Sequence, residues 1–320
     1  MSKVQNLTVL GSGVLGGQIA WHSAYKGKNV VVYDIAADAL DRCRIAHDHY
    51  AGIYRHELAA GDTNIAETKN RLSYFTDMAA AVAKADLVIE AVPEIPELKT
   101  SVYKQMADLL PARALIATNS STLLPRDFAE ATGRPDKYCA LHYANLIWTM
   151  NMVEIMAHPA TALSTLTAVT EFAIETGMLP IAVQKEQNGY VLNTWSIALM
   201  NAAQTLVTNG IAPPEDVDRT YLMVNRGARL GPMAMIDMVG MKTAFDVLNH
   251  WGRLNGDQQM LRNAAHIKTH MIDSGRMGLM AGKGYYDYPS PAYEAPDFLS
   301  VPPLSSVPGI VARAAPENWV

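Results

Sequence analysis

The sequence predicts an α/β protein, in which a mostly parallel sheet with helices on both faces is followed by an all-α domain. The first observation is an apolar strand, a glycine-rich turn, a helical run and a second strand within Leu7–Asp34. This span is about the size of one βαβ unit. Short apolar strands then alternate with helical segments up to about residue 187, which is typical of a parallel sheet. After residue 187 long amphipathic helical runs replace the alternation.

The individual elements follow from periodicity and turn residues. Short buried strands are expected at residues 7–10, 29–34, 87–89, 115–117 and 139–142. Helices are expected at 16–26, over 38–71 as two helices joined near Gly61, and at 98–110, 190–207, 214–223, 233–251 and 258–274. A proline-rich tail from about residue 289 is expected to lack regular structure. The domains are therefore predicted as 1–187 and 188–320.

Composition limits the class of protein. The 320 residues are 49% hydrophobic and 18% charged, which fits two folded domains with sizeable cores. A net charge of −5 argues against nucleic-acid binding, which requires clustered Lys and Arg. No apolar run is long enough for a membrane span or a signal segment. With only Cys43 and Cys139 and no metal-ligand spacing, we expect a soluble, cytoplasmic protein without disulfides or a bound metal.

The glycine-rich turn predicts a Rossmann-type dinucleotide site. Gly11, Gly13 and Gly16 follow the first strand and open a helix, with Val14 and Leu15 in the same loop. In this context glycine permits the tight turn, the approach of a pyrophosphate and close packing of helix on strand. Asp34 ends the second strand, where an acid binds the ribose 2′-hydroxyl and disfavours a 2′-phosphate. The predicted cofactor is NAD; a tight turn with a surface Asp is the structural alternative.

Polar residues follow two later strands. Glu90 and Glu94 flank the end of the strand at 87–89, and Asn119-Ser120-Ser121-Thr122 follows that at 115–117. The carboxyl ends of parallel strands face the ligand cleft, so both segments are candidates for binding. A solvated acidic loop and a helix cap are the alternatives.

His142 and Glu154 are the candidates for acid–base chemistry. His142 ends an apolar strand, and Glu154 lies inside the apolar run Met152–Met156. A buried acid requires a partner, and a carboxylate that holds an imidazole fixes its tautomer and supports its protonation. A lone structural histidine is the alternative. Asn145 lies close by, while Asn193 on its own indicates no more than a surface amide. Arg42, Arg44 and Arg55 with nearby histidines indicate a solvated helix face, and less readily a phosphate site.

These residues together resemble the 3-hydroxyacyl-CoA dehydrogenase family over about nine-tenths of the chain. The matching segments are Gly11–Gly16, Glu90-Ala-Val-Pro-Glu94, Asn119-Ser-Ser-Thr-Leu, His142-Tyr-Ala-Asn145 with Met150–Glu154, Gly189-Tyr-Val-Leu-Asn193, Gly231–Gly240 and Gly282–Tyr286.

The resemblance implies a role for each matched residue. His142 would be the general acid/base on the substrate 3-oxygen, oriented by Glu154. Ser121 and Asn193 would bind substrate oxygens, with support from Asn145. The residues at the cofactor would be Asp34, Glu90, Lys99, Asn119 and Asn145, and the helical half would form a homodimer. The substrate would be a β-hydroxy or β-keto acyl compound, possibly a CoA thioester.

One departure from the family pattern affects the substrate. The usual His-x-x-Asn-Pro is His142-Tyr-Ala-Asn145-Leu146 here, and Trp148 occupies a second common proline position. Proline fixes φ, so its loss alters the loop that shapes the acyl pocket. The variant resembles the diketoreductase-like subgroup, which implies CoA-free β-keto substrates as an alternative. A non-catalytic, crystallin-like NAD-binding protein is the alternative of another class.

Overall fold

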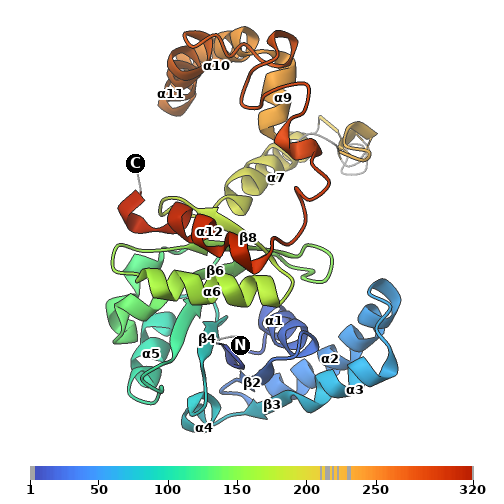
Figure 1. The fold of residues 1–320 in the computed structure, drawn as a ribbon, viewed down its shortest axis with the longest axis vertical. Coiled ribbons are helices and arrows are strands. Elements are labelled where there is room, and N and C mark those ends of the chain that lie inside the picture. Colours follow the sequence, from blue (N-terminus) through green and yellow to red (C-terminus); the bar gives the residue numbers. More distant parts are fainter. Residues whose placement is uncertain are drawn as a thin grey trace. The chain divides into compact units, whose positions relative to one another are not determined.

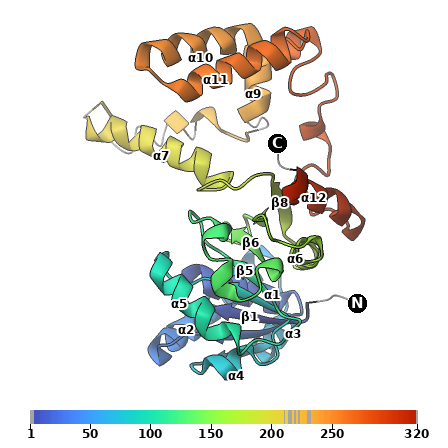
Figure 2. The ribbon, with the colours of Figure 1, turned by 90° about the vertical axis from the view of Figure 1, so that its left-hand side faces the viewer.

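The chain forms two compact units (Figures 1 and 2). The structure is a computed structural model, and it describes residues 4–209, 211–212, 217, 220–221, 223–228 and 232–318. The first unit contains the chain up to Asn201 and the segment from Val301 onward, and the second is Ala202–Ser300. The expected boundary at residue 187 differs from this division, because residues 188–201 and the C-terminal segment belong to the first unit by contact.

An eight-stranded sheet forms the centre of the first unit, in the order β3-β2-β1-β4-β5-β6-β7-β8. The strands are β1 (Asn6–Leu10), β2 (Asn29–Tyr33), β3 (Leu72–Phe75), β4 (Leu87–Glu90), β5 (Leu115–Thr118), β6 (Tyr138–Tyr143), β7 (Met152–Met156) and β8 (Leu179–Val183). Neighbouring strands are parallel except β6 and β7, which are antiparallel.

Helices cover both faces of this sheet because its buried strands alternate apolar side chains between the two faces. Leu87 and Ile89 belong to the core on one face, whereas Val88 belongs to the core on the other. The first face is covered by α1 (Val14–Tyr25), α2 (Ala37–Glu57), α6 (Leu163–Glu175) and α12 (Val307–Ala314). The second face is covered by α4 (Met78–Val82) and α5 (Pro96–Ala107). The predicted α/β fold class is confirmed.

The predicted elements of the first unit are largely present. α2 ends at Glu57 and α3 (Asp62–Asn70) follows after Gly61, as expected. The sequence analysis did not predict β3, β7, β8, α4 or α6. In the C-terminal tail, residues 292–294 and 304–306 form short 3₁₀ turns, and α12, which the sequence analysis did not predict, follows.

The second unit is helical in its described residues. α7 (Leu192–Thr208) leads into it, and α9 (Pro232–Val239), α10 (Met241–Asn255), α11 (Gln258–His266) and a π-helical turn (Ile267–Ile272) follow. Met241, Ala244, Ile267 and Met271 form its small buried core. The helix predicted over 233–251 is interrupted at Gly240, whose φ of 90° no helix contains. Most of the helix expected at 214–223 lies outside the described residues.

The topology places the ligand site. β1 lies between β2 and β4, so the direction of winding reverses there, and ligands of open α/β sheets bind at the carboxyl ends of the strands at that point.

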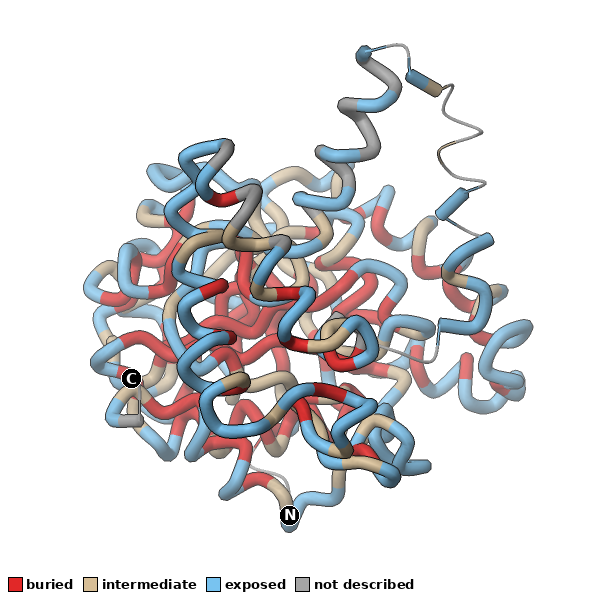
Figure 3. Tube along the Cα trace, turned by 90° about the horizontal axis from the view of Figure 1, so that it is seen from above, coloured by how far each residue is buried: buried red, intermediate tan, exposed pale blue. Residues whose placement is uncertain are grey.

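Figure 3 shows how buried and exposed positions alternate along the trace. None of the helices in the described part of the chain has the length and apolar character that a bilayer span requires.

Candidate active site

The glycine loop between β1 and α1 is packed tightly at two of its three glycines. Gly11 has a φ of 99°, and a Cβ there would lie 2.5 Å from the Ala91 carbonyl oxygen. A Cβ on Gly16 would lie 2.0 Å from the Gly11 carbonyl oxygen. Larger residues at either position would therefore push the loop away from β4 or the helix away from the loop. These two glycines are required by the fold itself.

Gly13 differs, because a Cβ there would meet no atom within 4 Å. Gly13 lines the cleft and precedes the first turn of α1, which has no side-chain cap. The open surface over Gly13 and the uncapped N–H groups of α1 fit a pyrophosphate, which needs close backbone approach and N–H donors. The loop thus suits a dinucleotide.

Asp34 is fixed beside this loop at the end of β2. Its Oδ2 accepts hydrogen bonds from the Ser12 backbone N–H at 2.9 Å and the Ser12 hydroxyl at 2.7 Å. Its Oδ1 accepts from the Ala36 N–H at 3.1 Å. Gly11, Asp34, Arg42 and Tyr50 line a cleft that shares Gly13 and Val14 with the cleft around His142. Asp34 therefore lines a cleft beside the glycine loop, with its carboxylate held in a fixed position.

His142 and Glu154 are hydrogen bonded, as the sequence analysis expected. The antiparallel register of β6 and β7 places the two residues directly opposite each other, and directly opposite residues project to the same face. Nδ1 of His142 lies 2.8 Å from Oε2 of Glu154, and both side chains are buried. The strand pairing alone therefore brings an imidazole and a carboxylate together.

The second oxygen of Glu154 is held by the segment before α7. Oε1 accepts the backbone N–H groups of Val191 at 2.8 Å and Leu192 at 2.9 Å. Tyr190, with a φ of 55°, turns the chain so that these groups point at the carboxylate, and its ring lies 4.9 Å from the His142 ring between centroids. Two N–H donors and the imidazole satisfy a carboxylate that has no exposed surface.

Glu90 and Lys99 form a buried ion pair beneath the cleft. Lys99 Nζ lies 2.7 Å from Glu90 Oε1, and the second oxygen of Glu90 accepts the hydroxyls of Tyr103 and Thr118. Both charged side chains are at most 1% exposed. The proximity of Glu90 and the complete burial of Tyr103 raise the pKa of the Tyr103 hydroxyl, so that it remains a donor. Glu90 lines neither cleft, and it contributes by holding Lys99, which does line the cleft around His142.

Glu94 organises the loop that carries Ser121. One of its oxygens accepts the hydroxyl of Ser120, the N–H groups of Ser121 and Thr122 at 3.1 Å, and the Thr122 hydroxyl at 2.9 Å. The other lies 3.1 Å from Lys99 Nζ. Although burial opposes ionisation, these donors and Lys99 lower the pKa of Glu94 to about 2. The sequence analysis expected the segment that contains Glu94 to be a candidate for binding, but not that Glu94 would hold the Ser121 loop.

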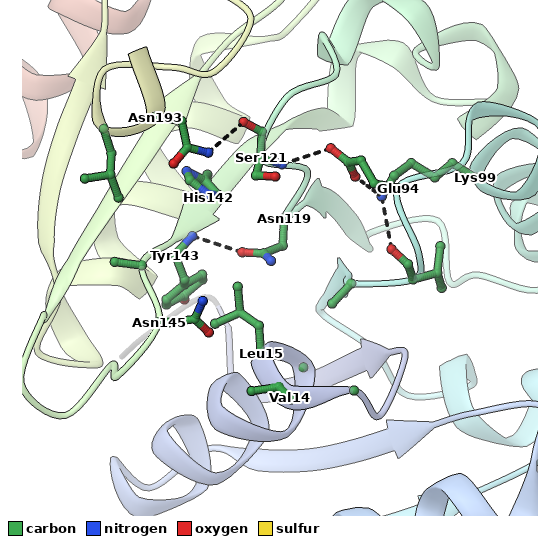
Figure 4. A pocket seen from close by; sticks show the side chains of 16 residues that line it. Val14, Leu15, Glu94, Lys99, Asn119, Ser121, His142, Tyr143, Asn145 and Asn193 are labelled. Atoms are coloured by element: carbon green, nitrogen blue, oxygen red, sulfur yellow. Dashed lines mark hydrogen bonds and ion pairs between the residues drawn. The ribbon is translucent and has the colours of Figure 1, made fainter. Parts of the chain in front are cut away.

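Two amides connect the remaining parts of the cleft. Asn119 accepts the Tyr143 N–H at 2.9 Å, and Asn193 donates to the Ser121 carbonyl oxygen at 3.1 Å. Figure 4 shows Ser121, His142 and Asn193 close together, with Asn145 and Leu15 on the side of α1. The cleft holds about 380 Å³.

The structure brings most of the predicted site residues into this one cleft. The lining residues among them are Gly13, Val14, Leu15, Gly16, Lys99, Asn119, Ser121, His142, Asn145 and Asn193. Gly11 and Asp34 line the adjoining cleft, and Glu154 lies behind His142. Sequence reasoning missed Tyr190, which turns the chain toward Glu154, and Gln18, whose side-chain oxygen accepts the Leu146 N–H. Both roles depend on backbone geometry that no motif encodes.

The fold and site define a dinucleotide-binding α/β protein with a paired His and Glu at the cofactor cleft. The models of the 3-hydroxyacyl-CoA dehydrogenase NAD binding domain and C-terminal domain match residues 6–187 and 189–288. The chain therefore belongs to the 3-hydroxyacyl-CoA dehydrogenase family of NAD-dependent oxidoreductases, and its cofactor is NAD.

Individual relatives agree with this family. The mitochondrial hydroxyacyl-coenzyme A dehydrogenase of Sus scrofa is 28% identical over 89% of this chain and 91% of its own length. A solved structure of diketoreductase, described as acting on dicarbonyl compounds, is 42% identical with a TM-score of 0.66, covering 90% of this chain and all of that one. The (S)-3-hydroxybutyryl-CoA dehydrogenase of Ralstonia eutropha is 27% identical with a TM-score of 0.64, over 90% of this chain and 100% of that one.

Proposed function

We propose that the protein interconverts 3-hydroxyacyl and 3-ketoacyl groups with His142 as the general acid/base. The observation that carries the proposal is the 2.8 Å His142–Glu154 pair at a cleft lined by the dinucleotide loop. When bound, NADH would donate a hydride to C3 of the keto group, or NAD⁺ would accept one from C3 of the hydroxyl compound, while the protein supplies orientation and proton transfer. Because Nδ1 is engaged by Glu154, proton exchange with the substrate 3-oxygen falls to Nε2.

The surrounding groups have supporting roles in this proposal. Glu154 holds His142 in one tautomer and stabilises the imidazolium that protonates the oxygen during reduction. The Ser121 hydroxyl and the Asn193 amide line the cleft near His142 and would hydrogen bond the substrate oxygens. Glu94 positions Ser121 through the backbone, and the Ser121 carbonyl in turn holds Asn193.

Replacing His142 tests the proposal. We expect His142→Gln to lower kcat by roughly 10²–10⁴-fold, the usual contribution of a general acid/base, while NADH still binds. His49→Gln, which removes an exposed imidazole on α2, is the matched control. Undiminished turnover by His142→Gln with intact NADH binding would contradict the assignment.

A second candidate keeps the chemistry but uses β-keto substrates without CoA. Every Lys and Arg between residues 37 and 71, on or next to α2 and α3, is already in an ion pair: Arg42–Asp38, Arg44–Asp41, Arg55–Asp62, Lys69–Asp48 and Arg71–Glu67. Lys99, the cation lining the cleft, is shared by Glu90 and Glu94. This charge balance does not favour a polyanionic carrier. NADH oxidation with acetoacetyl-CoA beside a CoA-free β-keto ester distinguishes the candidates, and no turnover on either would favour the non-catalytic alternative.

A homodimer and a cytoplasmic location remain proposals. α7 carries the exposed apolar side chains Trp195, Leu199 and Leu206, whose helical spacing places them on one face. Such a face is typical of a contact between subunits. Sedimentation equilibrium would test the dimer, and imaging of a tagged chain in its host would test the compartment.

A further inference from the structure

The connection between β6 and β7 joins the strand of His142 to the strand of Glu154. We call residues 144–151 the β6–β7 loop. Its first residues, Ala144 and Asn145, line the cleft beside His142. The path of this loop therefore shapes the wall of the cleft next to the proposed acid/base.

Leu146 gives the loop a backbone path that proline cannot follow. Its φ is 59°, in the left-handed region, whereas proline is fixed near −65°. Its N–H donates to the side-chain oxygen Oε1 of Gln18 at 2.8 Å, and the Ile147 N–H approaches the same oxygen at 3.4 Å. Proline has no N–H to donate. Gln18 is buried on α1, in the second turn after the glycine loop.

The rest of the loop is tied to α2. The Trp148 ring packs on Tyr50 and Tyr54, with centroids 5.6 Å and 6.1 Å apart. The Thr149 hydroxyl donates to Glu57 at 3.1 Å. Leu146 and Trp148 thus both have specific partners on α1 and α2, the helices next to the glycine loop and Asp34.

We infer that the hydrogen bond between Gln18 and the Leu146 N–H determines the substrate class, favouring β-keto substrates without CoA. The bond joins the loop to α1 directly after Asn145, which lines the cleft. Leu146 and Met150 are 45% and 53% exposed, so the outer surface of the loop beside the cleft is apolar. With the ion-paired cations of α2 and α3, this surface suits a neutral, apolar substituent. The inference rests on the proposed function and makes Gln18 a positioning residue.

Four variants test the inference, with the ratio of kcat/KM for ethyl acetoacetate to that for acetoacetyl-CoA as the readout. We expect Leu146→Pro and Gln18→Met, which lacks the acceptor oxygen, each to move the ratio at least tenfold toward the CoA thioester. Gln18→Glu keeps an acceptor oxygen and should stay within about threefold of the parent ratio, and so should Leu146→Gly, which keeps the N–H and tolerates positive φ. The expected tenfold change in the ratio corresponds to 1.4 kcal/mol. NADH affinity should change less than about threefold in all four variants.

A double variant separates this bond from general loop damage. Because proline removes the donor and Met removes the acceptor of one bond, Leu146→Pro should change the ratio less than about threefold further in the Gln18→Met background. An unchanged ratio in folded Gln18→Met would overturn the inference, as would a shift in Leu146→Gly as large as in Leu146→Pro. Loss of turnover on both substrates in His142→Gln supports the proposed function whichever way the ratio moves, so the two failures are distinguishable.

Discussion

At the residue scale, the register of β6 and β7 is what brings His142 and Glu154 together. Positions 142 and 154 are paired across antiparallel strands, so the backbone hydrogen bonds that build the sheet also hold the two side chains on one face. Val191 and Leu192 then fix the carboxylate from the other side. The imidazole is preorganised before any substrate binds.

Asp34 carries a residue-scale prediction about the cofactor. Its carboxylate is held by Ser12, and Arg42 lines the same cleft. Replacing Asp34 with Asn removes the negative charge that repels a 2′-phosphate. We expect the ratio of kcat/KM for NADH to that for NADPH to fall by roughly tenfold or more, about 1.4 kcal/mol in the barrier difference.

The exposed Asp41, which pairs with Arg44 on α2, provides the matched control. Asp41→Asn removes the same charge at a position that does not line the cleft. Its NADH-to-NADPH ratio should stay within about twofold of the parent, since surface pairs contribute little. An unchanged ratio in Asp34→Asn would show that the discriminating acid lies elsewhere.

Individual site residues differ in how far the sequence could predict them. Gly11, Asp34, His142 and Glu154 could be singled out from the sequence. Each stands at a strand end or inside an apolar run, where its residue type is informative. Gln18 was not, since its partner lies 128 positions away and a Gln inside a helix indicates nothing by itself. Contacts of that separation depend on the completed fold.

At the scale of elements, two of the three strands that the sequence analysis did not assign lie at the edges of the sheet, where the signals are weak. The third, β7, was noted as an apolar run but was not assigned as a strand. β3 alternates partly buried with exposed residues at one edge of the sheet, and β8 at the other edge contains Pro180. Edge strands tolerate proline and polar residues because half of their backbone groups need no strand partner. The central strands β1, β4 and β5 are buried from both sides and were predicted from their apolar runs.

α12 is a helix that the sequence analysis did not predict. It begins at the end of the proline-rich tail, and its own proline lies in the first turn, where proline is tolerated. Val307, Ile310, Val311 and Ala314 are buried in the core shared with α6. We expect Ile310→Asp to lower the free energy of unfolding of the first unit by about 3–5 kcal/mol, since it removes a buried side chain and buries an unpaired charge.

Urea denaturation followed by tryptophan fluorescence measures this loss. Leu304→Asp is the control, because Leu304 is 50% exposed in the turn before α12 and a surface substitution usually changes stability by less than about 0.5 kcal/mol. Equal midpoints for Ile310→Asp and the parent would mean that α12 contributes nothing to the first unit.

For the whole molecule, the fold class could be predicted, and the two family models change over at the predicted boundary between residues 187 and 189, whereas contacts divide the chain at a different point. The class depends on the order of strand and helix patterns, which is local information. The division depends on where residues 188–201 and the segment from Val301 pack, and no linker composition marks either point. The segment from Val301 belongs to the first unit although it follows the second in the sequence, and the hydrophobic periodicity of the sequence does not indicate this.

Two buried histidines give the first unit a predicted dependence of stability on pH. Burial lowers the pKa of His22 and of His47 to about 4, and each ring bonds a tyrosine hydroxyl and a backbone carbonyl. In the unfolded chain both titrate near 6.5. Between pH 6.5 and 4 the unfolded state therefore binds more protons, and the free energy of unfolding falls as pH falls.

The size of the effect follows from linkage. Each histidine contributes a slope of up to about 1.4 kcal/mol per pH unit within that window and none well above it. His47→Gln should therefore reduce the slope of unfolding free energy against pH relative to the parent between pH 6.5 and 4. His49→Gln, which removes an exposed imidazole from the same helix, should not. Equal slopes for His47→Gln and the parent would show that His47 is protonated in the folded protein at these pH values, and that the bond to the Gly17 carbonyl outweighs its burial.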